Sequence, residues 1–132
     1  MSNKKNTDRS TPGGGKRERY LQPSILMGLF HRPTYGYELI QTIQRFGFVE
    51  GSAPPGMIYR HLRQLEEDGL VASQWHTEGA GPARRIYTLT ADGREVLALW
   101  VDHMAAQAGL LTSFVAEYRQ AAADSGPRQT DG

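Results

Sequence analysis

Residues 54–70 read PPGMIYRHLRQLEEDGL, and their spacing predicts an amphipathic helix. At 100° per residue, one narrow sector of this helix contains Ile58, Leu62, Leu65 and Gly69. We expect that sector to face a core. The acidic residues crowd into the last turn, although the helix dipole favours cations there. This pattern indicates that something besides the stability of the isolated helix has shaped the segment.

The flanking segments add two shorter helices before this one, and two strands and a long helix after it. Residues 21–30 and 35–46 have helical character, with Thr34 as the expected N-cap of the second helix and Gly47 as its left-handed end. Residues 71–75 and 84–89 are rich in β-branched and aromatic side chains, which predicts a hairpin. Thr90 is the expected N-cap of the long helix.

This order of elements predicts a winged helix-turn-helix, an α+β fold that is mainly α. We expect four segments: a disordered basic tail over residues 1–18, a DNA-binding domain over 19–90, a dimerisation helix over 91–120 and a disordered tail over 121–132. The basic tail has two interpretations, a solvated segment or an arm that adds phosphate contacts.

Bulk composition excludes several classes of protein. The chain has 132 residues, a net charge of +1 and no cysteine, so disulfides and thiolate metal sites are excluded. No apolar run approaches the roughly 18–20 residues of a membrane span, and we expect a cytoplasmic protein. The four histidines have no metal-ligand spacing, and no nucleophile motif or phosphate loop is present, so neither an enzyme nor a cofactor is expected.

The outer face of the 54–70 helix is the predicted DNA-reading surface. Its candidate residues are Gly56, Met57, Tyr59, Arg60, Arg63 and Gln64. Arginine can pair with guanine and glutamine with adenine, while a glycine near the helix start lets a phosphate approach the backbone. The last-turn acids would then lie away from the phosphates. The alternative is a solvated face of mixed charge.

Arg84 and Arg85 follow a hairpin tip of small residues, where a wing would meet DNA. Strand alternation sends the two side chains to opposite faces. One can therefore reach a phosphate or the minor groove while the other packs locally, and we expect both to lie near DNA. An ordinary exposed hairpin is the alternative.

Three motifs in order resemble the PadR-like family of bacterial transcriptional regulators: YGYE at 35–38, PGxIYxxLxxLExxGLV at 55–71 and GPxRRxYxLTxxG at 81–93. The resemblance covers roughly residues 20–100. It implies a winged-helix domain that dimerises through a C-terminal helix and usually acts as a ligand-responsive repressor. The chain resembles the compact type, and its flanking residues resemble the polyhydroxybutyrate-responsive branch.

The resemblance also implies that Tyr37 lies near a phosphate, with Tyr59 on the recognition helix and the Arg84–Arg85 pair in the wing. Two positions depart from the family pattern. Tyr35 stands where histidine is common, and Pro54 stands where a Ser or Asp helix cap is common. Because proline cannot cap through its side chain, Ser52 is the alternative cap.

The long helix contains a heptad-like apolar seam that predicts a homodimer. The expected interface residues are Leu97, Trp100, Val101, Met104, Ala108, Leu111, Phe114, Val115 and Tyr118. A single thick core stripe in a monomer is the alternative. Trp100 has two interpretations, a plain core residue or a contact for a small apolar effector.

The sequence therefore predicts a homodimeric regulator that binds double-stranded DNA at a near-palindromic operator, with repression as the expected output. The alternative is a winged helix that serves as a protein-interaction module. That use would not require arginines at 60, 63, 84 and 85 together.

Overall fold

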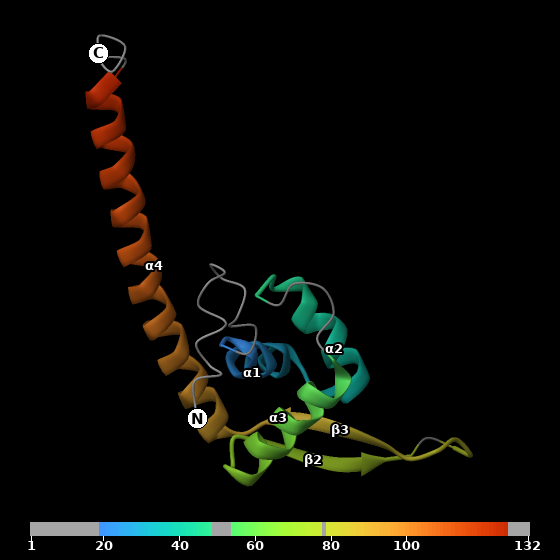
Figure 1. Ribbon diagram of the computed structural model, residues 1–132. Helices are drawn as coiled ribbons and strands as arrows, with labels where there is room; N and C mark the ends of the chain where they lie inside the picture. The colour runs from blue at the N-terminus through green and yellow to red at the C-terminus, as the bar shows by residue number, and fades with distance from the viewer. Residues whose placement is uncertain (1–18, 49–53, 78, 127–132) are drawn as a thin grey trace, which may run out of the picture. The chain divides into compact units, whose positions relative to one another are not determined.

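The computed structural model describes residues 19–48, 54–77 and 79–126. Its elements are α1 (Leu21–His31), β1 (Thr34–Tyr35), α2 (Gly36–Arg45), α3 (Pro55–Glu67), β2 (Val71–His76), β3 (Arg84–Leu89) and α4 (Ala91–Ser125). Figure 1 labels the four helices and the strands β2 and β3. The predicted fold class, a mainly helical winged helix-turn-helix followed by a long helix, is confirmed. The chain divides into two compact units, one ending at Leu97 and the other beginning at Ala98.

The core of the first unit lies among the three short helices. Its fully buried side chains include Leu21, Ile25, Leu26, Leu39, Ile43, Ile58, Leu62 and Leu65. The predicted inner face of α3 is confirmed for its three apolar residues, none of which exposes any surface. This burial fixes the rotation of α3 about its axis, and so determines which of its side chains face outward.

Gly69 does not belong to that inner face. It is exposed and has a φ of 80°, and its N–H donates to the Glu66 carbonyl at 3.1 Å. The Leu70 N–H then donates to the Leu65 carbonyl at 3.0 Å, which completes a left-handed helix end. The prediction placed Gly69 by periodicity, but the helix has already ended at Glu67.

The sheet has the order β1-β3-β2, and both of its strand pairs are antiparallel. Strand β1 was not predicted, because two residues are too few to show an alternating pattern. The prediction of Thr34 as the N-cap of α2 is wrong. Thr34 pairs with Tyr87, its hydroxyl donates to the Arg32 carbonyl at 2.9 Å, and Tyr35 occupies the N-cap position without a side-chain bond. Gly47, with a φ of 80°, confirms the expected left-handed end of α2.

Helix α3 begins without a side-chain cap. Pro54 is its N-cap residue and Pro55 stands in the first turn, where a missing N–H leaves no hydrogen bond unmade. The Pro54 carbonyl accepts the Met57 N–H at 3.0 Å. Ser52, the alternative cap, lies outside the described residues, as do the tail residues 1–18.

Helix α4 begins as predicted and ends later than predicted. The Thr90 hydroxyl accepts the Gly93 N–H at 3.0 Å, which confirms the expected N-cap. The helix reaches Ser125 instead of ending near residue 120, because residues 121–123 are alanines, the strongest helix formers. The predicted tail therefore begins inside a helix, and residues 127–132 lie outside the described part. None of the described helices has the combined length and apolar character of a membrane span.

Candidate nucleic-acid interface

The outer face of α3 presents the predicted reading residues to solvent. Gly56, Arg60, Arg63 and Gln64 are exposed, while Met57 is half-buried on the flank. Gln64 donates through Nε2 to the Asp68 carboxylate at 3.1 Å, one turn further along the helix. The arginines therefore lie on the side of α3 opposite Ile58, Leu62 and Leu65, on a helix whose rotation is fixed by core packing.

Tyr59 connects the first half of α3 to the start of α2. A Cβ added at Gly36 would lie 2.6 Å from the Tyr59 Cε1 atom and 2.9 Å from its hydroxyl, so only glycine leaves room for this ring. The Tyr59 side chain remains 39% exposed. The tyrosine thus packs between two helices and still borders the outer face of α3.

The acidic end of α3 faces the hairpin. The Ser73 hydroxyl on β2 donates to Glu66 Oε2 at 2.7 Å, and Arg85 Nη2 lies 3.8 Å from Glu66 Oε1. Glu66 thus attaches α3 to the sheet. The sequence prediction placed the acids away from phosphates but did not anticipate this structural role, because the partners lie seven and nineteen residues downstream.

Arg85 lies on the α3 side of the hairpin. Its Nε donates to the Ser73 hydroxyl at 2.9 Å, and its guanidinium carbon lies 5.3 Å from the centre of the Trp75 ring. Together with the ion pair to Glu66, these contacts hold the side chain within the hairpin–helix junction. Arg85 therefore has a packing role, which is one of the two roles that strand alternation allowed.

Arg84 points to the other face and meets the start of α2. Its Nη1 donates to the Tyr37 hydroxyl at 2.8 Å. The guanidinium carbon lies 5.0 Å from the Tyr35 ring centre and 5.9 Å from that of Tyr37, and the two rings stack at 5.8 Å with 14° between their planes. The structure thus brings together Tyr37 and Arg84, two candidate residues 47 positions apart.

Two members of this cluster, Tyr35 and His76, were not among the predicted site residues. The Tyr35 hydroxyl lies 2.9 Å from His76 Nδ1, and His76 is the strand partner of Arg84. The available signal was the departure of Tyr35 from the family pattern. Its partner could not be read from sequence, because it depends on the register of the hairpin.

Tyr87 lies at the centre of the sheet, between Thr34 and Ser73. Its side chain is buried, and this burial raises the pKa of the Tyr87 phenol above its ordinary value, with the nearby Arg85 opposing the shift. The phenol therefore stays protonated and acts as a packing residue within the sheet.

The family model of the transcriptional regulator PadR-like family matches residues 25–99, which is more than half of the chain. The chain belongs to this family. This family membership confirms the resemblance that the three sequence motifs indicated. The members of the family are transcriptional regulators and not enzymes. The branch within the family stays a prediction.

Three relatives illustrate the range of similarity. A probable transcriptional regulator of Mycobacterium tuberculosis is 30% identical over 81 residues, which cover 61% of this chain and 43% of that protein. The structure of Bacillus subtilis PadR in complex with operator DNA is 26% identical, with a TM-score of 0.56, and the match covers 63% of this chain and 46% of that one. A PadR family regulator from Eggerthella lenta is 29% identical, with a TM-score of 0.58 and coverages of 77% and 83%. This PadR-like chain therefore spans less than half the length of the mycobacterial and Bacillus relatives.

The expected dimer seam lies on α4, mostly in the second unit. Val101, Ala108, Leu111, Phe114, Val115 and Tyr118 are exposed, and Trp100 and Met104 are half-buried. Leu97 differs, because it is 5% exposed and belongs to the core of the first unit. The exposed part of the expected dimer seam therefore begins after Leu97.

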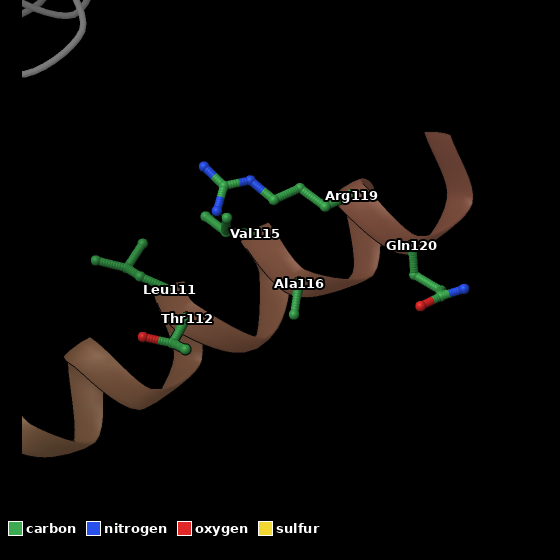
Figure 2. A pocket seen from close by; sticks show the side chains of 6 residues that line it. All are labelled: Leu111, Thr112, Val115, Ala116, Arg119 and Gln120. Atoms are coloured by element: carbon green, nitrogen blue, oxygen red, sulfur yellow. The ribbon is translucent and has the colours of Figure 1, made fainter. Parts of the chain in front are cut away.

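Trp100, the candidate effector contact, is half-buried on α4. Its ring lies 6.3 Å from that of His103 in an edge-on arrangement. A shallow depression elsewhere on α4 is lined by Leu111, Thr112, Val115, Ala116, Arg119 and Gln120, whose side chains all project from the one helix (Figure 2). Within the described residues, no group of three metal-ligating side chains comes together.

Proposed function

We propose that this PadR-like protein binds double-stranded DNA as a homodimer, reads a near-palindromic operator and represses transcription. The observation that carries the proposal is the hydrogen bond between Arg84 and Tyr37. It joins the wing to the start of α2, and the Tyr59 ring joins the start of α2 to α3. Recognition helix, α2 and wing thereby form one connected surface, the combination that winged helices present to a duplex.

Each part of this surface has a chemical role in the proposal. Arg60 and Arg63 on the exposed face of α3 reach base edges or phosphates in the major groove, where arginine pairs with guanine. Arg84 and Tyr37 contact a backbone phosphate. Gly56, with open space around it, lets the backbone at the start of α3 approach a phosphate. Arg85 supports the wing through Glu66 and stays close to DNA without being its main contact.

The dimer is proposed from the exposed apolar side chains of α4. Leu110, Leu111, Phe114 and Tyr118 are each at least 66% exposed, and a contiguous apolar surface of this kind marks an interaction site. Two copies related by a twofold axis would present two recognition helices roughly 34 Å apart, one turn of DNA. A small apolar effector acting near Trp100 and a cytoplasmic location belong to the same proposal.

Salt-dependent binding tests the proposal. We expect affinity for a duplex from the protein's own promoter region to fall steeply with salt, with the slope of log K decreasing by about 0.9 for each phosphate contact removed. Alanine at Arg60, Arg63 or Arg84 should weaken binding. Arg45→Ala is the matched control, because it removes the same charge from the exposed last turn of α2, at the far end from Tyr37.

Two results would contradict the proposal. One is binding that ignores salt, and the other is binding that survives the three alanine substitutions together. Either would favour the alternative, a winged helix that contacts another protein.

A further inference from the structure

We propose that Tyr35 and His76 are positioning residues that hold the Arg84 guanidinium in place to receive a DNA phosphate. The inference rests on the proposed DNA-binding function and assigns roles to two residues outside the predicted contact set. Neither is proposed to touch DNA. Their role is to restrict the conformations of a long, flexible side chain before DNA arrives.

The guanidinium of Arg84 is held by neutral aromatic groups. It lies over the Tyr35 ring at 5.0 Å and donates to the Tyr37 hydroxyl at 2.8 Å. A planar guanidinium that stacks on a ring keeps its charge and its remaining N–H donors. Arg85 differs in this respect, because Glu66 lies 3.8 Å from it and offsets its charge. Arg84 is therefore the wing arginine whose charge stays available to an incoming anion.

Tyr35 is itself held from three directions. Its backbone pairs with Ile86 in the sheet, its ring stacks on Tyr37, and its hydroxyl meets His76 Nδ1 at 2.9 Å. His76 lies directly opposite Arg84 across the hairpin. The contacts therefore form a closed circuit, from Arg84 to Tyr35, from Tyr35 to His76 and back to Arg84 through the strand pairing.

Such a circuit lowers the entropic cost of binding. Arginine loses much rotamer freedom when a phosphate immobilises it, and a side chain that is already ordered loses less. We therefore expect the loss of either positioning residue to weaken DNA binding by about three- to tenfold, without removing any phosphate contact. Loss of Arg84 itself should remove one contact and lower the salt slope by about 0.9.

The test is a set of variants titrated with the promoter duplex over a range of salt concentrations. Tyr35→Ala and His76→Ala should weaken binding and leave the salt slope unchanged, because neither removes a phosphate contact. Tyr35→Phe keeps the ring and should weaken binding less than Tyr35→Ala, and His76→Asn should restore part of the affinity lost in His76→Ala. The double variant Tyr35→Ala/Arg84→Ala should bind no more weakly than Arg84→Ala alone. Gln74→Ala, on the same face of β2 as His76, is the control.

A second readout needs no DNA. Protons of the Arg84 side chain should show an upfield ring-current shift in NMR spectra, which Tyr35→Ala reduces and Tyr35→Phe retains. Circular dichroism of each variant shows whether it has folded, and His76→Ala, at an exposed strand end, keeps the test valid if Tyr35→Ala unfolds.

The outcomes separate this inference from the proposed function. If the wild type binds duplex with a steep salt dependence, but the losses from Tyr35→Ala and Arg84→Ala simply add, the positioning role is wrong and the function stands. Unchanged affinity in both His76→Ala and Tyr35→Ala would overturn it as well. If the wild type shows no salt-dependent binding, the proposed function fails and the positioning role fails with it.

Discussion

The two units of the chain treat their apolar residues in opposite ways. Up to Leu97, the elements α1, α2, α3, β2 and the first turns of α4 all contribute buried apolar side chains to a core, although Trp75 on β2 is 64% exposed. From Ala98 onward, Leu110, Leu111, Phe114 and Tyr118 are each at least 66% exposed. The first unit therefore has a core of its own, whereas the second contains one helix whose large apolar side chains are exposed.

Charging the seam should give the largest effect. Leu111→Asp with Val115→Asp should convert the proposed dimer into single chains of 14.7 kDa, as measured by sedimentation equilibrium at micromolar concentration. Because a symmetric dimer contains each substitution twice, four buried side chains at about 1.5 kcal/mol each amount to about 6 kcal/mol, or roughly 10⁴-fold in the dissociation constant.

The matched control adds the same charges on the opposite side of α4, as Ala106→Asp with Ser113→Asp. Both positions are exposed, and the mass should remain that of two chains. A wild-type mass near one chain would contradict the dimer itself.

Removing a core side chain from the first unit should give the next largest effect. In the monomeric seam variant, Leu62→Ala should lower the free energy of unfolding by about 2–5 kcal/mol, because Leu62 is fully buried and leaves a cavity. Urea titration followed by circular dichroism measures this change. Leu110→Ala, which removes the same atoms from an exposed site, should change it by less than about 0.5 kcal/mol. Equal losses of unfolding free energy in Leu62→Ala and Leu110→Ala would contradict the difference in burial between the two units.

Two glycines of α4 differ in their packing within a single helix, since Gly93 is closely surrounded and Gly109 is not. Gly93→Ala should destabilise the first unit by about 1–3 kcal/mol, because the added Cβ meets the Leu70 carbonyl. A Cβ added at Gly109 would have no other atom within 4 Å. Gly109→Ala should therefore stabilise the helix by about 0.5–1 kcal/mol, since alanine is the better helix former. Thermal unfolding of both variants checks the opposite signs.

The smallest effect at ordinary pH concerns Tyr87. Its pKa is raised by burial, so the folded chain holds the phenolic proton more tightly than the unfolded chain does. The resulting contribution is fully present below about pH 10 and is lost as the pH rises through the folded-state pKa. Unfolding free energies measured across the alkaline range should fall less steeply in Tyr87→Phe than in the wild type. Identical slopes would contradict the raised pKa.

Local patterns in the sequence were sufficient for most of the fold. The inner face of α3, the left-handed Gly47 and the Thr90 cap each depend on residues within a turn or two of one another. Helical periodicity and capping chemistry are short-range, so a single sequence displays them. Strand β1 was missed because its two residues are defined only by their pairing with β3, about fifty positions away.

The residues of the candidate site could be predicted from the sequence, but their contacts with one another could not. Residue types, their order along the chain and the family motifs were sufficient to identify Arg84, Arg85 and Tyr37 as candidates. Only the tertiary structure decided that Arg85 pairs with Glu66 while Arg84 rests on Tyr35 and bonds to Tyr37. The physical reason is that a hydrogen-bond partner is set by hairpin register and helix packing, which bring together side chains far apart in the sequence.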